Sequence, residues 1–160
     1  MIHPGQLTVR PATLDDLEVL TDFSAAMAFE TEQRSLDRIR LRGGTLAVLE
    51  RSERGQFYVA DVQEAHGSLA VGQCLITYEW SDWRNAQFWW IQSVYVRPDW
   101  RRRGVYRRMH ERIHELARSR PDVCGLRLYV ERDNRVAQSA YQSLKMVQAP
   151  YEIWEVDFVL

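Results

Sequence analysis

A basic turn with one glycine joins a strand to a helix in the second half of the chain. Residues 94–108 read Val-Tyr-Val-Arg-Pro-Asp-Trp-Arg-Arg-Arg-Gly-Val-Tyr-Arg-Arg, which is typical of a strand end, a short turn and a helix start. The first N–H groups of a helix have no partner within it, and the helix dipole makes that end positive. With arginines beside it, such a turn can bind a phosphate or pyrophosphate. The same residues would also suit an ordinary turn with solvated arginines. The choice between the two interpretations therefore depends on the neighbouring elements.

Four tryptophans and two carboxylates gather in and around a second segment, residues 79–90. Aromatic faces beside carboxylates suit a cationic amine through cation–π and ion-pair contacts. Core packing, a dimer interface and the wall of a binding pocket are three explanations that the sequence leaves open. Trp89 and Trp90 are consecutive in a predicted strand, so they point to opposite faces. We expect one in the core, and the other in a pocket or against a second subunit.

Composition narrows the class of protein. The chain has 160 residues, which suits a single domain over residues 1–160, and its six tryptophans exclude a disordered chain. The formal net charge of -1 argues against binding nucleic acid or an anionic membrane with the whole molecule. Cys74 and Cys124 have neither zinc-site nor disulfide spacing, and His110 and His114 lack a third ligand, so no metal is expected. Without a leader or a membrane-spanning apolar run, we expect a cytoplasmic protein.

Hydrophobic spacing and cap residues predict the elements that position these segments. Thr13 is a predicted cap for a helix to about Phe29, and Ser35 for a second helix that ends at Gly43-Gly44 or continues to about Arg51. A third helix follows the basic turn to about Arg118, and Asn134 caps a fourth through about Leu144. Strands are predicted over residues 6–10, 56–62, 69–79, 87–97 and 123–130, with two short ones near 146–147 and 151–158. A hairpin loop is expected over residues 80–86.

The order of these elements predicts an α/β fold. Three consecutive strands over residues 56–97 form antiparallel hairpins, so the sheet is mixed and mostly antiparallel, with helices on both faces. Residues 87–97, the helix after them and residues 123–130 form a βαβ unit, whose two strands are parallel. Ligands of open α/β sheets bind at the carboxyl ends of such strands. The basic turn lies at this end of the parallel pair.

The turn and the order of elements resemble the GNAT superfamily, the Gcn5-related N-acetyltransferases, across essentially the whole chain. The family signature is Gln/Arg-x-x-Gly-x-Gly/Ala, and residues 101–106 read Arg-Arg-Arg-Gly-Val-Tyr. Tyr106 departs from this signature at its last position, where the family has Gly or Ala. Its bulk is expected to narrow the space in which the turn approaches the pyrophosphate. Asn134 at the start of the late helix and Tyr141 two turns later match a second family feature. The start, residues 9–13, is also typical.

The resemblance implies that acetyl-CoA is the cosubstrate and that no metal takes part. Backbone N–H groups of the turn would hold its pyrophosphate, and the strand before it would bind the pantetheine arm as an added strand does. Tyr141 would be the general acid for the leaving thiolate, although the same tyrosine could simply pack its helix on the sheet. Asn134 could be a plain helix cap, and the valines plain core. The implied cofactor-binding residues are Val94, Tyr95, Val96, Arg101, Arg102, Arg103, Gly104, Val105, Tyr106, Arg107 and Asn134.

The general base is not evident in the sequence. The position that holds a glutamate in the histone-acetylating branch of the family is Gln92 here, which cannot take a proton. Either a chain of waters or another carboxylate must act. We hypothesise that Glu79 is the base; the same carboxylates could equally be solvated loop residues. Residues assigned to substrate binding are Glu30, Trp80, Asp82 and Trp83.

These observations predict an acetyl-CoA-dependent N-acetyltransferase that acts on a primary amine of a small molecule or peptide by direct transfer. A non-catalytic acyl-CoA sensor is the alternative that Gln92 keeps open, and Tyr141 argues against it. A nucleic-acid-binding domain built on the arginine run is a third reading, which the near-neutral charge disfavours. No nucleic acid and no membrane are expected as partners, and a homodimer is one option.

Overall fold

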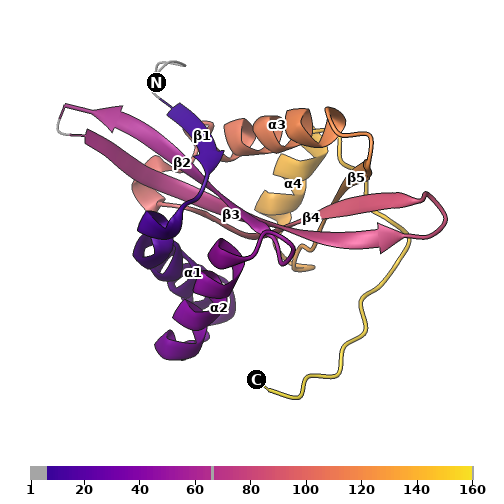
Figure 1. The fold of residues 1–160 in the computed structure, drawn as a ribbon, viewed down its shortest axis with the longest axis horizontal. Helices are drawn as coiled ribbons and strands as arrows, with labels where there is room; N and C mark the ends of the chain where they lie inside the picture. Colours follow the sequence, from indigo (N-terminus) through magenta and orange to yellow (C-terminus); the bar gives the residue numbers. More distant parts are fainter. Residues whose placement is uncertain (1–6, 66, 160) are drawn as a thin grey trace. The chain divides into compact units, whose positions relative to one another are not determined.

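The computed structural model describes residues 7–65 and 67–159, so the predicted strand start at Gln6 lies outside the described residues. The chain separates into two compact units, Met1–Tyr129 and Val130–Leu160. The first unit holds a five-stranded sheet in the order β1-β2-β3-β4-β5 (Figure 1). Its strands are β1 (Leu7–Pro11), β2 (Gln56–Glu64), β3 (Gly67–Ser81), β4 (Ala86–Val96) and β5 (Val123–Leu128). Pairing is antiparallel from β1 to β4, and β4 and β5 are parallel, as the βαβ unit predicts.

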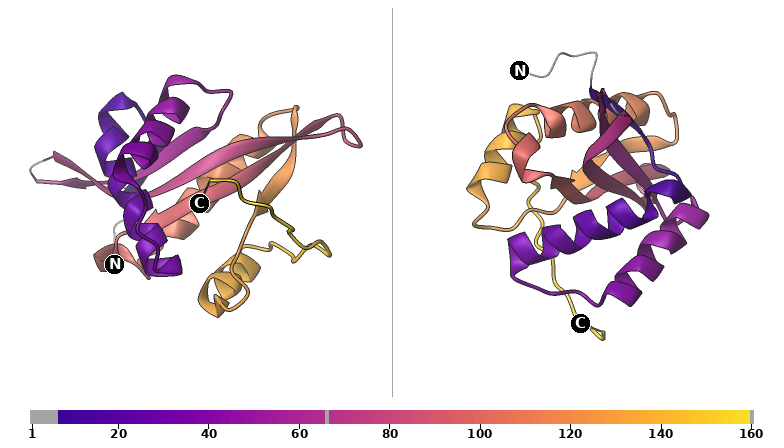
Figure 2. Two further views of the ribbon diagram at one scale, coloured as in Figure 1. Left: turned by 90° about the horizontal axis from the view of Figure 1, so that it is seen from below. Right: turned by 90° about the vertical axis from the view of Figure 1, so that its left-hand side faces the viewer.

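Helices cover both faces of this sheet, which confirms the predicted fold class. A short 3-10 turn η1 (Leu14–Asp16) leads into α1 (Leu17–Glu32), and α2 (Arg38–Glu50) lies beside α1 (Figure 2). A second 3-10 turn η2 (Pro98–Trp100) precedes α3 (Val105–Arg118). In Figure 1, α3 lies on the opposite side of the sheet from α1 and α2.

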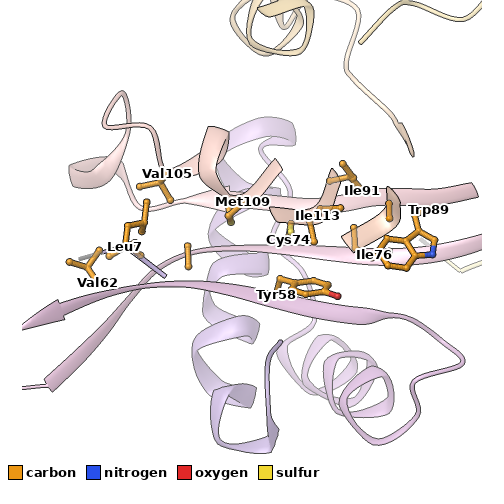
Figure 3. Close-up of a cluster of buried hydrophobic side chains, with 13 residues drawn as sticks. Leu7, Tyr58, Val62, Cys74, Ile76, Trp89, Ile91, Val105, Met109 and Ile113 are labelled. Atoms are coloured by element: carbon orange, nitrogen blue, oxygen red, sulfur yellow. The ribbon is translucent and has the colours of Figure 1, made fainter. Parts of the chain in front are cut away.

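The side chains of β2 alternate between two hydrophobic clusters, one on each face of the sheet. Phe57 and Val59 point to one face, where they pack with Leu20 of α1. Tyr58 and Ala60 point to the other face, because successive strand residues face opposite sides. There they join a larger cluster with α3 that Figure 3 shows in close-up. The residues that α3 contributes to this cluster are Val105, Met109, Ile113 and Ala117.

Over its described residues, 130–159, the second unit contains one helix, α4 (Arg135–Ser143). Asn134 caps it as predicted, because its side-chain oxygen accepts a hydrogen bond from Ala137 N at 3.0 Å. The two predicted strands near residues 146–147 and 151–158 are wrong, since no strand is found over residues 130–159. Their apolar alternation favours a strand, but a strand also needs a partner, and the hydrophobic residues Ile153, Trp154 and Val156 are exposed.

Two further boundaries differ from the sequence prediction. Asp37, not Ser35, caps α2, since its carboxylate oxygen accepts hydrogen bonds from Ile39 N and Arg40 N, both at 2.9 Å. The helix then continues through Gly43-Gly44 to Glu50. The hairpin loop between β3 and β4 is shorter than predicted, because β3 extends to Ser81 and β4 begins at Ala86.

The glycine in the middle of α2 is expected to weaken that helix. A Cβ on Gly43 would meet no atom within 4 Å, so the position requires no glycine for space. Glycine in a helix interior costs about 0.5–1 kcal/mol relative to alanine. Gly43→Ala should therefore raise the free energy of unfolding in urea by about that amount.

Gly72→Ala is the opposite control. A Cβ there would lie 2.9 Å from the Tyr95 carbonyl oxygen and 3.3 Å from Val105 Cγ1, so this change should destabilise the protein. A loss of stability in both variants would contradict the account of Gly43.

Candidate functional site

The basic turn has the backbone that an anion site requires. Arg102 (φ 59°) and Gly104 (φ 86°) are both left-handed, and α3 begins directly after Gly104. The first bond of the helix runs from Arg108 N to Gly104 O at 3.0 Å, so the N–H groups of Val105 and Arg107 have no acceptor within the helix. Gly104 occupies the N-cap position, and a glycine has no side chain that could cap this end of the helix. The helix therefore directs N–H groups and the positive end of its dipole at the turn.

The arginines of the turn divide into two groups. Arg101 is held by contacts within the protein. Its Nη2 lies 2.5 Å from Glu30 of α1, and its Nε donates a hydrogen bond to Val96 O at 2.8 Å. Arg102, Arg103 and Arg107 are exposed. These three arginines are the ones whose position suits an anion in solvent.

Tyr106, the departure from the family signature, packs on the hydrophobic core. Its ring packs against the α3 core cluster, and its hydroxyl is buried. The side chain is thus directed into the protein, while its backbone stays in the first turn of α3. That Tyr106 narrows the approach to the pyrophosphate stays a prediction.

The edge of β4 next to the turn is open. β5 pairs with residues 87–91 of β4, from Gln87↔Val123 to Ile91↔Leu128, and no pairing to β5 continues beyond that within residues 7–129. Among residues 7–129, no strand therefore lies beside Gln92 to Val96 on the β5 side. Val96 O already accepts a hydrogen bond from Arg101 Nε, and the rest of this segment is where an extended ligand would pair. Val94 and Val96 pack on the core as well, so both roles proposed for them are compatible.

A hydrogen bond links Tyr95 of β4 to Glu30 of α1. The Tyr95 hydroxyl donates to Glu30 Oε1 at 3.2 Å, and burial together with the neighbouring Glu30 raises the pKa of Tyr95. Through Arg101, the same carboxylate joins α1 to the basic turn. Glu30 is thus placed beside the turn, and both of its oxygens have partners.

Glu79 lies in a different cluster. Arg127 Nη1 donates to Glu79 Oε1 at 2.7 Å, and Trp90 Nε1 donates to the other carboxylate oxygen. Trp90 stacks on Tyr129 with ring centroids 4.3 Å apart, and the Arg127 guanidinium lies 3.7 Å from the centre of the Phe88 ring. Trp89 is buried on the opposite face, as the strand alternation predicts. Glu79 is therefore an ion-paired part of an aromatic wall.

The remaining substrate-binding candidates lie at the tip of the β3–β4 hairpin. Trp80 and Trp83 are both exposed, and Asp82 Oδ1 accepts a hydrogen bond from Trp83 N at 2.9 Å. Glu79 is six residues from Gln73, the β3 partner of Tyr95, which places it about 20 Å along the strand from the Glu30 contact. The structure does not bring the assigned residues into one group.

In the second unit, Tyr141 lies two turns after the Asn134 cap. Burial raises the pKa of its phenol, so it stays protonated at neutral pH. Within this unit, the spacing of the two residues on α4 is as the sequence predicts.

Two residues of the candidate site were not identified from the sequence. Arg127, the partner of Glu79, is one arginine among many, and nothing in its neighbourhood marks it. Gln73 carries a signal that could have been used: it is a lone amide in the apolar run from Val71 to Ile76, and it is fully buried.

Within residues 7–65 and 67–159, no group of three or more His, Cys, Asp or Glu is placed to hold a metal ion. Over the same residues, no helix has the length and apolarity that a membrane span needs.

Comparison with known proteins identifies the family. A sequence model described as the acetyltransferase (GNAT) family matches residues 17–146. A possible acetyltransferase from Clostridium difficile 630 is 36% identical, with a TM-score of 0.88 over 97% of this chain and 99% of that chain. The comparison with curated proteins gave no match.

Two other solved structures share the fold at lower identity. A ribosomal-protein-alanine N-acetyltransferase from Brucella melitensis biovar Abortus 2308 is 14% identical, with a TM-score of 0.73 over 96% of this chain and 99% of that chain. A predicted acetyltransferase from Clostridium acetobutylicum, solved with acetyl-CoA, is 15% identical, with a TM-score of 0.75 over 94% of this chain and 96% of that chain. Together with the signature turn, the family match and the 36% identical relative show that this chain belongs to the GNAT family of acetyltransferases.

Proposed function

We propose that the protein is an N-acetyltransferase that moves the acetyl group of acetyl-CoA directly to a primary amine of a small molecule or peptide. The observation that carries this proposal is the open edge of β4 beside the uncapped start of α3. An extended pantetheine arm fits the first, and a pyrophosphate fits the second. A relative of the same fold was solved with acetyl-CoA, which supports this choice of cosubstrate.

The residues of this chain would divide the work as follows. N–H groups of the turn over 102–107 hold the pyrophosphate, and Arg102, Arg103 and Arg107 add positive charge. Main-chain groups of residues 94–96 align the pantetheine, so that the carbonyl is held for attack by the amine. Tyr141 gives its phenol proton to the leaving thiolate, and Asn134 fixes the start of the helix that carries it.

Binding and turnover test the proposal separately. Calorimetry should show saturable binding of coenzyme A, and free thiol should appear when acetyl-CoA is mixed with an accepted amine. The amine panel should include polyamines, amino acids, aminoglycosides and N-terminal peptides. Absence of coenzyme A binding would exclude the proposal.

A sensor module that binds acyl-CoA without turnover is the second candidate. It is favoured by Gln92, which stands at the position where the histone-acetylating branch of the family would carry a glutamate. The Gln92 amide donates a hydrogen bond to Thr77 Oγ1 at 2.5 Å. Coenzyme A binding without thiol release for any amine in the panel would select this candidate.

Glu79 as the general base can be tested by the pH dependence of the rate. If Glu79 accepts the amine proton, Glu79→Gln should remove the acidic limb of the kcat/KM profile. Because its carboxylate is paired with Arg127 and Trp90, a role in shaping the acceptor wall would instead raise KM for the amine and leave that limb in place. An unchanged profile would remove Glu79 as the base.

The control for this experiment is Asp82→Asn. Asp82 is the other carboxylate of the hairpin, and its Oδ1 accepts a hydrogen bond from Trp83 N of the turn backbone. A loss of the acidic limb in Asp82→Asn alone would move the assignment to that residue.

A further inference from the structure

β4 contains an irregularity at the start of its open edge. Gln73 of β3 pairs with Tyr95, but Leu75 pairs with Gln92, so β4 has one residue more than β3 over this interval. Ser93 takes a left-handed conformation at φ 48°, which is unfavourable for a residue with a Cβ. Such a bulge bends the strand and redirects its backbone groups. It lies directly before residues 94–96, the segment proposed to bind the pantetheine arm.

Gln73 holds this bulge from the α1 side of the sheet. Its side chain is fully buried, and its Nε2 donates to Ser93 O at 3.2 Å and to Ser24 Oγ of α1 at 2.9 Å. A carbonyl oxygen can only accept, so the amide nitrogen, not its oxygen, must face Ser93. The orientation of this amide is therefore determined by the bulge.

That orientation leaves Gln73 Oε1 buried without a hydrogen-bond partner among the described residues. A buried unpaired oxygen is costly, and an apolar side chain of the same size would avoid the cost. The amide therefore does not suit this position as core packing alone.

Gly72 completes the arrangement on the other face. A Cβ on Gly72 would lie 2.9 Å from Tyr95 O, so glycine permits the close approach of β4 at this point. Val105, the first residue of α3, lies 3.3 Å from the same added Cβ. Two consecutive residues of β3 thus set the path of β4 next to the basic turn.

We propose that Gln73 is a positioning residue of the acetyl-transfer site, which holds the Ser93 bulge so that the backbone of residues 94–96 meets the pantetheine arm. This inference rests on the proposed function. Gln73 does not touch the reacting atoms; it acts through the main chain of β4.

The test separates positioning from structural support. Gln73→Met keeps the volume but removes the donor to Ser93 O and Ser24 Oγ, and it also removes the unpaired oxygen. The lost donor lowers stability and the removed oxygen raises it, so the net change in stability in urea should be small. Coenzyme A should bind about tenfold more weakly, the effect of misaligning about one hydrogen bond. Adenosine 3′,5′-bisphosphate, which lacks the pantetheine arm, should bind as it does to the unchanged protein. Ser24→Ala, which removes only the second acceptor of the amide, is the matched control and should bind coenzyme A normally.

A second pair of variants tests the bulge without altering Gln73. Ser93→Gly tolerates the left-handed conformation and should retain coenzyme A affinity, whereas Ser93→Val should lose it to a similar extent as Gln73→Met. In the free protein, the NMR amide shifts of residues 94–96 should change in Gln73→Met and Ser93→Val but not in Ser24→Ala.

The outcomes distinguish this inference from the proposed function. Normal coenzyme A affinity and unchanged amide shifts in Gln73→Met would overturn the positioning role while leaving the function intact. If the unchanged protein fails to bind coenzyme A, the proposed function fails and the inference with it. Equal weakening of coenzyme A and the bisphosphate, together with lost stability, would show a merely structural role.

Discussion

Replacement of Arg10 by methionine is expected to reduce the free energy of unfolding by about 3 kcal/mol, because it leaves two buried carboxylates without their cation. Arg10 of β1 contacts Asp16 through Nη1 and Nη2, at 2.8 and 2.9 Å, and its Nε lies 2.5 Å from Asp61. Asp16 is 7% exposed and Asp61 is 4% exposed. The expected loss is at the low end for a buried ion pair, since the Arg10 side chain itself is partly exposed.

The matched control is another arginine with a carboxylate partner. Arg42 Nε lies 2.7 Å from Glu18, but both side chains of this pair are exposed. Arg42→Met should therefore change stability by less than about 1 kcal/mol. Urea unfolding of both variants measures the difference, and equal losses would contradict the argument from burial.

The Arg10 network also predicts a pH dependence. Hydrogen bonding from the Arg10 guanidinium lowers the pKa of Asp16 below its usual value of about 4. A carboxyl whose pKa is lower in the folded protein contributes stability above its unfolded pKa and loses it as the pH falls through the folded one. Stability of the unchanged protein should therefore decline below about pH 4, and this decline should be smaller in Arg10→Met.

Local patterns predicted the parts of the fold that local sequence determines. The helical spacing of Val105, Met109 and Ile113 gave the correct end of α3, and the βαβ order gave the parallel pairing of β4 and β5. The turn over residues 101–106 was identified from its glycine and from the helix that follows. In each case the residues that determine the structure lie within a few positions of one another.

Contacts between distant segments could not be predicted in the same way. Glu79 is paired with Arg127, 48 residues later, and Gln73 contacts Ser24, 49 residues earlier. Neither pairing leaves a periodic signal in the sequence. Similarly, Ser35 and Asp37 are both good helix caps two residues apart, so residue type alone does not distinguish them, and the structure has Asp37 at the cap.

If Tyr141 is the general acid proposed above, Tyr141→Phe is expected to lower kcat by about 10²–10⁴-fold, because a positioned general acid contributes an effect of that size. The change removes one oxygen and keeps the ring, so the affinity for coenzyme A should stay the same. Burial raises the pKa of the Tyr141 phenol above its usual value of about 10, so the acid form persists across the physiological range. Activity of the unchanged protein should therefore not fall through loss of this proton below about pH 10.

Tyr151→Phe is the control, since Tyr151 is an exposed tyrosine of the same unit. Thiol release at saturating amine and acetyl-CoA measures kcat, and calorimetry measures coenzyme A affinity in each variant. An interaction made only in the transition state lowers kcat and kcat/KM together and leaves ground-state binding unchanged. If Tyr141→Phe instead weakens coenzyme A binding and retains kcat, Tyr141 packs its helix and another group or water supplies the proton.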